Sequence, residues 1–154
     1  SMPKFETTRR VQHSPRDMFA LVADVESYPE FLPLCEALKV TSRRERENKT
    51  LLIADMTVGY KAIRETFTSQ VMLDPEALRI EVQYLNGPFR YLNNVWTFLP
   101  ADGGSDIGFY IDYEFKSRML GILMGSMFDV AFRKFSQAFE ERADKIYGPP
   151  AAPI

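Results

Sequence analysis

Residues 105–117 read SDIGFYIDYEFKS, and together with the long apolar stretch after them they decide the fold of this chain. Apolar side chains alternate here with polar or small ones, which is the period of a strand with one buried face. The apolar members are Ile107, Phe109, Ile111, Tyr113 and Phe115. From Met119 to about Tyr147 the apolar spacing becomes that of a helix. We expect this strand and helix to enclose either a dense core or a lined cavity.

Six more segments have the pattern of strands. They cover residues 5–12, 37–46, 50–58, 62–73, 78–84 and 92–99, and the seventh strand covers residues 107–116. Short turns join the last six strands, which predicts an antiparallel meander. Ser14-Pro15 is a helix start, and the prolines of residues 24–34 allow only short helical turns. The predicted class is α+β: a curved antiparallel sheet of about seven strands around a long C-terminal helix, with two short helices after the first strand.

The composition is that of one ordinary globular domain. The chain has 154 residues, 45% of them apolar and 26% charged, and its formal net charge is −2. This charge provides no general attraction for nucleic acid, and DNA is not an expected partner. Cys35 is the single cysteine, which fits a reducing compartment and excludes an internal disulfide. We expect one cytoplasmic domain over residues 3–148, with a tag scar at 1–2 and a loose tail at 149–154.

The first half of the C-terminal helix is apolar nearly all round. Only Ser126 and Asp129 interrupt the apolar character between Met119 and Phe132. A helix on one sheet needs a single apolar face, so the surplus meets a ligand, a second chain, a membrane surface or residues 28–34. The predicted membrane or partner surface consists of Met119, Leu120, Leu123 and Met124.

Residues 24–35, DVESYPEFLPLC, resemble the signature of the coenzyme Q-binding START-like family, which also contains RatA-type proteins. Further matches follow in the family's order, and they are VGYK at 58–61, RETF at 64–67, GPF at 87–89, IDYEF at 111–115 and AFEERA at 138–143. The resemblance covers about residues 5–148.

The resemblance implies a helix-grip fold, in which the sheet grips the C-terminal helix around an elongated apolar cavity. It also implies a carrier or chaperone for ubiquinone that supports respiration and is not a catalyst. Some bacterial members carry a toxin label, for a proposed block of ribosomal subunit association.

Trp96 shares a strand face with Leu92, Asn94 and Phe98. It either stacks on a quinone ring or an isoprenoid tail, or is a large core residue. Residues 28–34 form either a lid over one end of the cavity or a plug in the open end of the sheet. The candidate cavity residues are Trp96, Leu92, Phe98, Phe89, Phe67, Ile63, Glu65, Ile111, Tyr113, Leu123, Met127 and Phe31.

Glu65 shares a strand face with Ile63 and Phe67. A carboxylate on an apolar face is costly unless it is protonated or hydrogen-bonded. Glu65 therefore either anchors a quinone carbonyl or a water, or the inside and outside of this strand are the reverse of our assignment.

Arg43, Arg44 and Arg46 belong to a group of basic residues on the first two strands and their turn. If these strands are neighbours, the group, which includes Arg9 and Arg10, gathers on one edge of the sheet. This basic edge either contacts anionic headgroups or ribosomal RNA phosphates, or protects an exposed edge strand from aggregation.

No catalytic or metal-binding pattern is present in the sequence. His13 is the single histidine, and Cys35 has no neighbouring histidine to activate it. The leading hypothesis is a non-enzymatic carrier of ubiquinone or a related polyprenyl lipid, without a catalytic cofactor, which visits the inner membrane to exchange its ligand. The alternatives are a ribosome-associating protein that uses the basic edge and a cyclase-like enzyme that uses the cavity.

Overall fold

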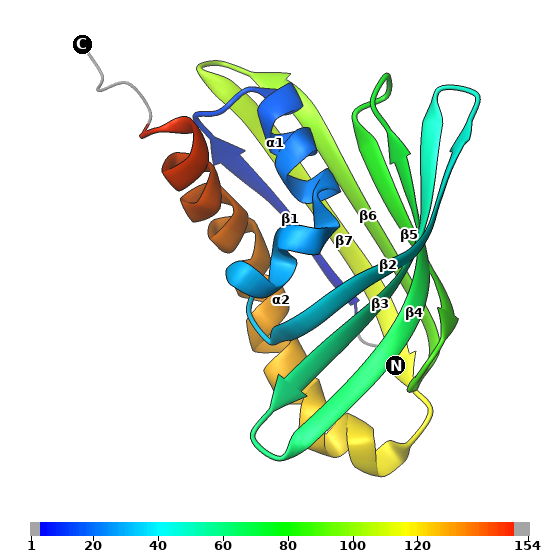
Figure 1. Ribbon diagram of the computed structural model, residues 1–154. Helices are drawn as coiled ribbons and strands as arrows, with labels where there is room; N and C mark the ends of the chain where they lie inside the picture. Colours follow the sequence, from blue (N-terminus) through cyan, green and yellow to red (C-terminus); the bar gives the residue numbers. More distant parts are fainter. Residues whose placement is uncertain (1–3, 150–154) are drawn as a thin grey trace.

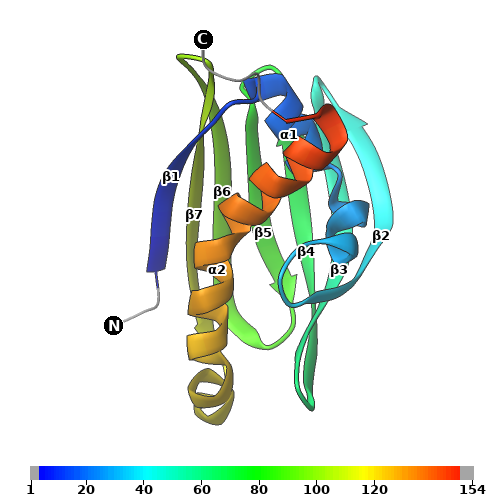
Figure 2. The same ribbon diagram turned by 90° about the vertical axis from the view of Figure 1, so that its left-hand side faces the viewer.

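The computed structural model describes residues 4–149 and contains a seven-stranded antiparallel sheet that curves around a long helix (Figure 1). The strands are β1 (Lys4–Val11), β2 (Cys35–Arg46), β3 (Lys49–Tyr60), β4 (Ile63–Asp74), β5 (Arg79–Asn86), β6 (Phe89–Ala101) and β7 (Gly104–Phe115). The helices are α1 (Pro15–Ala23), the short 3-10 helix η1 (Val25–Glu30) and α2 (Arg118–Tyr147). All three helices lie on the concave face of the sheet (Figure 2). The predicted fold class is confirmed.

The local structure follows from the sequence signals. Ser14 caps α1 by accepting a hydrogen bond from the Asp17 backbone N–H, and Pro15 occupies the first helical position. Ser117 caps α2 in the same way at Leu120, and the helix ends at Gly148. Every second residue of β7 from Ser105 to Phe115 is buried, as the alternation predicts. This inner row forms the wall against which α2 packs.

The strand order is β1-β7-β6-β5-β4-β3-β2, so β1 and β2 form opposite edges of the sheet. The condition under which the basic residues of these two strands would share one edge is therefore not met. After β1 the chain crosses the concave face through α1 and η1, and it enters the sheet again at the far edge (Figure 1). Arg9 and Arg10 consequently lie at one edge, and Arg43, Arg44 and Arg46 lie at the other.

The expected tag scar at residues 1–2 lies outside the described residues, as does the expected tail apart from Pro149. None of the helices within residues 4–149 combines the length and the apolar composition needed to cross a bilayer.

Candidate ligand cavity beneath helix α2

An apolar cavity lies between the inner face of the sheet, the middle of α2 and residues 25–35. Its volume is about 110 Å³. The residues 25–35 and α2 contribute Val25, Tyr28, Leu32, Pro33, Leu34, Cys35, Phe128, Ala131, Phe132, Phe135 and Phe139 to the lining. The sheet contributes Leu38, Ala54, Met56, Val58, Phe67, Ser69, Val71, Ile80, Val82, Leu92, Asn94, Trp96, Phe109 and Ile111. Three separate parts of the chain therefore enclose one space.

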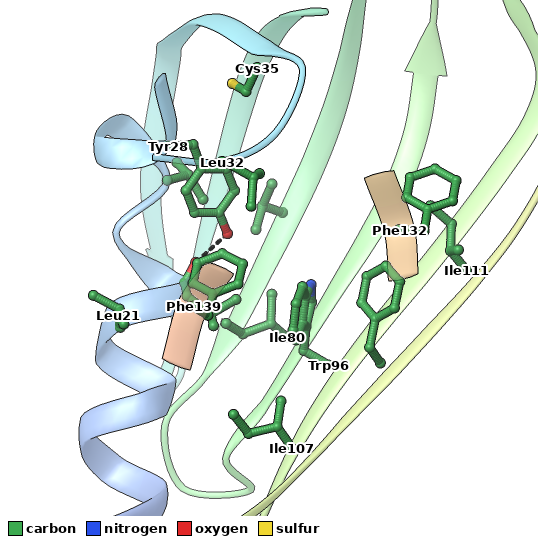
Figure 3. Packing of buried hydrophobic residues seen from close by; sticks show 14 of the residues in the cluster. Leu21, Tyr28, Leu32, Cys35, Ile80, Trp96, Ile107, Ile111, Phe132 and Phe139 are labelled. Carbon is green, nitrogen blue, oxygen red and sulfur yellow. Dashed lines mark hydrogen bonds between the residues drawn. The ribbon is translucent and has the colours of Figure 1, made fainter. Parts of the chain in front are cut away.

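Residues 25–35, which we call the lid segment, cover the cavity between the start of β2 and the C-terminal half of α2. The hydroxyl of Tyr28 donates to the carbonyl of Val22, which ties η1 to the end of α1 (Figure 3). Leu34 has a positive φ of 67°, a conformation that costs free energy for a residue with a branched side chain. The carbonyl of Leu34 accepts a hydrogen bond of 3.0 Å from the Gly59 backbone N–H, which joins the lid segment to β3.

Arg142 of α2 holds the outer side of the lid segment. Its Nη2 lies 2.9 Å from Glu30 Oε1, and its guanidinium lies 5.1 Å from the centre of the Phe31 ring. Phe139, one turn earlier on the same helix, meets Tyr28 and Phe31 edge-to-face, with ring centres 5.4 and 5.2 Å apart. One face of α2 therefore clamps the lid segment by a charge and by aromatic packing.

The polar groups in the lining are few and neutral. Asn94 Nδ2 donates to the Tyr110 carbonyl at 2.8 Å, and the Cys35 thiol lies 3.7 Å from the Ala37 carbonyl. Burial raises the pKa of the Cys35 thiol to about 11 and also raises the pKa of Tyr28. Both groups therefore stay protonated at neutral pH, and the cavity presents an apolar, uncharged interior.

Trp96 lies at the centre of this wall. In Figure 3 it stands between Ile80 and Phe132, and its indole nitrogen points away from Ile107 toward the side of Tyr28 and Leu32. Its ring packs against Phe109 and Phe139, with ring centres 4.6 and 5.2 Å apart. Trp96 is therefore both a buried core residue and a wall of the cavity.

A family model described as polyketide cyclase / dehydrase and lipid transport matches residues 11–140. The chain belongs to this family. The resemblance to START-like proteins is thereby confirmed, and the architecture is their helix-grip fold.

Two curated relatives of this family carry different names. One is the ribosome association toxin RatA of Rickettsia prowazekii, which is 34% identical over 94% of this chain and 99% of its own length. The other is the mitochondrial coenzyme Q-binding protein COQ10 of Drosophila melanogaster, 33% identical over 92% of this chain and 58% of its own length. RatA proteins of further bacteria match at a similar level.

Solved structures agree on the fold. The 18 kDa protein CC1736 of Caulobacter crescentus superposes with a TM-score of 0.80 at 33% identity, covering 96% of this chain and 99% of its own. The ZhuI aromatase/cyclase of Streptomyces sp. R1128 has a TM-score of 0.75 at 18% identity, covering 94% and 95%. At this lower identity the likeness to the cyclase shows a shared fold alone.

Within this helix-grip frame, four of the predicted cavity residues line the cavity, namely Trp96, Leu92, Phe67 and Ile111. Eight others do not, namely Phe98, Phe89, Ile63, Glu65, Tyr113, Leu123, Met127 and Phe31. Helices cover the inner face unevenly, which explains three of the differences. Phe19 of α1 packs on Phe98, and Phe128 of α2 packs on Phe89 and Tyr113, so that these side chains are surrounded by other rings.

The remaining differences have separate reasons. Ile63 and Glu65 lie near the start of β4, paired with Tyr60 and Val58, and of these four residues Val58 alone lines the cavity. The assignment of the inner face of β4 is nevertheless right, because Phe67, Ser69 and Val71 alternate into the cavity. Phe31 lies on Phe139, on the lid side of the clamp. Leu123 and Met127 precede the stretch of α2 that lines the cavity.

Two of the four residues predicted for the surface of α2 are not exposed. Met119 and Leu123 are 64% and 50% exposed, but Met124 is completely buried, and Leu120 is half-buried. Ile122 was not predicted, and at 69% it is the most exposed of the large apolar residues described. One residue advances a helix by about 100°, and a segment that is apolar all round does not reveal which of its sides faces the sheet.

Of the predicted basic edge, the arginines of β2 lie together in the structure, and those of β1 lie elsewhere. Arg43, Arg44 and Arg46 are exposed near the tip of the β2–β3 hairpin, at the free edge of the sheet. Arg43 lies 4.0 Å from Glu26, a distant and exposed ion pair. Arg9 and Arg10 lie at the opposite edge, where they pair with Glu140 and Asp106.

Sequence reasoning missed most of the lid-side and helical lining, including Phe139, Phe132 and Ala131 of α2. It also missed Ser69, although the alternation through Ile63, Glu65 and Phe67 leads directly to it. Periodicity identifies the inner face of a strand, but it does not identify which inner residues pack against other side chains and which line a cavity.

Proposed function

We propose that this chain binds a polyprenyl lipid of the ubiquinone type in the cavity and delivers it without chemical change. The observation that carries the proposal is the apolar cavity beneath a lid segment that the side chains of Arg142 and Phe139 hold against α2. The lipid transport family and a relative named for coenzyme Q binding support the same ligand class.

The size of the cavity has a direct consequence for this function. Its volume of about 110 Å³ is well below the roughly 300–1,000 Å³ typical of sites for drug-sized ligands. A quinone ring with an isoprenoid tail therefore needs a wider cavity, and we propose that the lid segment moves away from α2 to admit it. Burial of the tail, at about 25 cal/mol per Å² of apolar surface, supplies the free energy for this opening.

The chemistry of the lining favours a carrier over an enzyme. General acid–base catalysis requires groups that exchange protons near the working pH. The thiol of Cys35 has a pKa of about 11 because of its burial, so it is a poor nucleophile at neutral pH. The amide of Asn94 and the hydroxyl of Ser69 do not titrate in this range. The cyclase alternative consequently has little support in this cavity.

The ligand proposal is tested by filling the cavity. Ala131 lines it, whereas Ala138 lies two turns later on α2, is half-buried and is outside the lining. We expect wild-type protein and Ala138→Leu to retain polyprenyl quinone through native purification, as detected by organic extraction and mass spectrometry, and Ala131→Leu to lose it. This pair is preferable to Trp96→Ala, because loss of the Trp96 contacts with Phe109 and Phe139 costs stability as well as binding.

Two outcomes of this experiment oppose the proposal. The first is wild-type protein that contains no quinone and takes up no added decylubiquinone. The second is an Ala131→Leu variant that binds as well as wild-type protein, which places the ligand elsewhere.

A second candidate function is association with the ribosome through Arg43, Arg44 and Arg46. The names of the relatives favour it more than the first, because RatA of Rickettsia prowazekii matches over 99% of its length and COQ10 over 58%. The three side chains are exposed at a free sheet edge, where they are able to reach phosphates.

Charge reversal separates the two functions. Replacing Arg43, Arg44 and Arg46 by Glu is expected to abolish co-sedimentation with ribosomes and to leave lipid binding unchanged. Ala131→Leu is expected to have the opposite effect. Co-sedimentation that survives the triple reversal would reject this surface.

A further inference from the structure

Ser69 of β4 is an unusual member of the cavity lining. It is 4% exposed, and its inner-facing neighbours along the strand, Phe67 and Val71, are apolar. Among the protein atoms of residues 4–149, its Oγ has no hydrogen-bond partner. A buried hydroxyl without a hydrogen-bond partner destabilises a fold, and most buried hydroxyls in proteins therefore have a partner.

The hydroxyl, amide and thiol groups of the other lining residues are not in this position. Tyr28 donates to the Val22 carbonyl, Asn94 donates to the Tyr110 carbonyl, and the Cys35 thiol contacts the Ala37 carbonyl. Ser69 is therefore the lining hydroxyl that remains available to a molecule inside the cavity.

The surroundings of Ser69 leave room for such a molecule. On β3 its partner is Ala54, which has the smallest side chain of the sheet residues in the lining. On the other side, the β4–β5 register shifts between Thr68 and Ser69, so that Ser69 pairs with Tyr84 at an irregularity of the sheet. Such bulges commonly redirect side chains next to binding sites.

We infer that the Ser69 hydroxyl donates a hydrogen bond to an acceptor oxygen of the bound lipid, and so selects lipids that carry a carbonyl or ether oxygen on the head group. This inference rests on the proposed lipid-binding function. A quinone ring offers acceptor oxygens and no donor, so the hydroxyl, which is able to rotate, acts as the donor. A pure hydrocarbon of the same shape leaves the hydroxyl unpaired, and this difference provides the selectivity.

The test compares two buried serines. Ser136 of α2 is also 4% exposed and has an Oγ without a protein partner among the described residues, but it lies outside the cavity lining. Ser69→Ala and Ser136→Ala each remove one unpaired hydroxyl, so neither variant is expected to lower the thermal stability of the free protein. Two probes with the same tail, decylubiquinone and decylbenzene, are titrated by calorimetry.

We expect Ser69→Ala to weaken decylubiquinone binding about tenfold, which corresponds to about 1.4 kcal/mol, and to leave decylbenzene binding unchanged. Ser136→Ala is expected to change neither affinity. Ser69→Thr, which keeps the hydroxyl, is expected to retain most of the affinity for decylubiquinone.

Equal binding of decylubiquinone by wild-type protein and Ser69→Ala would overturn this inference and leave the proposed function intact. An equal loss of both probes in Ser69→Ala would also overturn it, because the serine would then act through the shape of the wall. Wild-type protein that binds neither probe would instead reject the lipid-binding function, and this inference with it.

Discussion

The two halves of helix α2 are attached to the protein in different ways. In residues 131–147, Glu140 pairs with Arg9 at 2.7 Å, Arg142 with Glu30 at 2.9 Å and Asp144 with His13 at 2.6 Å. These contacts reach β1, η1 and the β1–α1 connection. In residues 118–130, by contrast, the described contacts include no side-chain hydrogen bond or ion pair to another element.

The first half is held by apolar contacts on one side only. Phe128 packs on Phe89 and Phe115, while Met119, Ile122 and Leu123 on the other side are at least half exposed. In Figure 1 these first turns form the lower end of the molecule, and the last turns lie beside α1. This division between the two halves predicts that the second half holds the lid segment in place and that the first half offers an apolar surface.

The largest expected effect is at Phe139, where the second half meets both the lid segment and Trp96. Phe139 is completely buried, and its ring contacts Tyr28 and Phe31. Phe139→Ala is expected to lower the free energy of unfolding by about 3–5 kcal/mol, measured by urea denaturation. Ile122→Ala in the first half is expected to change it by no more than about 0.5 kcal/mol. Similar losses in both variants would contradict the division.

A smaller effect is expected when the clamp on the lid segment is weakened. Arg142→Met keeps the apolar stem but removes the ion pair with Glu30 and the contact of the charge with the Phe31 ring. The expected cost is about 1 kcal/mol, because Glu30 is exposed and its ion pair contributes little. If this cost falls on lid opening, iodoacetamide reacts about fivefold faster with Cys35, measured by mass spectrometry.

Arg133→Met is the matched control for the clamp. Arg133 makes the same two kinds of contact, an ion pair with Asp129 and a position over the Phe5 ring, but neither involves the lid segment. Its alkylation rate at Cys35 is expected to equal that of wild-type protein. Equal rates in all three proteins would show that Arg142 does not restrain the lid segment.

Alkaline pH is expected to loosen the lid end before the end near Phe128. Burial raises the pKa of Cys35 from 9.0 to about 11, so the folded protein holds this proton more tightly than the unfolded chain. The free energy of unfolding is therefore unaffected by this group below pH 9 and decreases as the pH rises from 9 to 11. Tyr113, which packs on Phe128, has its pKa raised by burial to about 12 and titrates later.

Denaturation of wild-type protein and Cys35→Ala between pH 8 and 11, under reducing conditions, isolates the contribution of the thiol. The wild-type protein is expected to lose more stability than the variant over this range. Parallel pH profiles would mean that the thiol is not effectively buried.

The sequence predicts the elements better than their arrangement. Alternation along residues 107–115 identifies β7 and its buried face, because successive side chains of a strand point to opposite faces and every second one shares a face. Nothing in the sequence places β1 beside β7 instead of β2, since that choice depends on the path of α1 and η1. For the cavity, Leu92 and Phe89 reach the same inner face because the β6–β7 register shifts between Phe89 and Tyr91, and Phe89 is packed over by neighbouring rings that include Phe128 of α2. Ser69 is recognisable from the strand pattern, but its lack of a partner requires the structure.

Changes at the exposed surface of the first half of α2 are expected to have the smallest effect on stability but a large effect on membrane binding. Met119, Ile122 and Leu123 lie within one turn, and Lys116 and Arg118 stand beside them. An exposed apolar helix face flanked by basic residues suits the surface of a membrane with anionic lipids, where the proposed carrier would exchange its ligand. Leu123→Glu is expected to abolish flotation with liposomes that contain anionic lipid, and to change the free energy of unfolding by less than about 0.5 kcal/mol.

Leu99→Glu provides the control for this last experiment. Leu99 is 59% exposed, as accessible as Leu123, but it lies near the β6–β7 hairpin at the other end of the molecule. Because both variants add one negative charge, a general loss of attraction to anionic lipid would reduce flotation equally in both. Loss in Leu123→Glu alone places the membrane contact on residues 118–130 of α2. Unchanged flotation in Leu123→Glu would reject that contact and leave the binding of lipid in the cavity as a separate question.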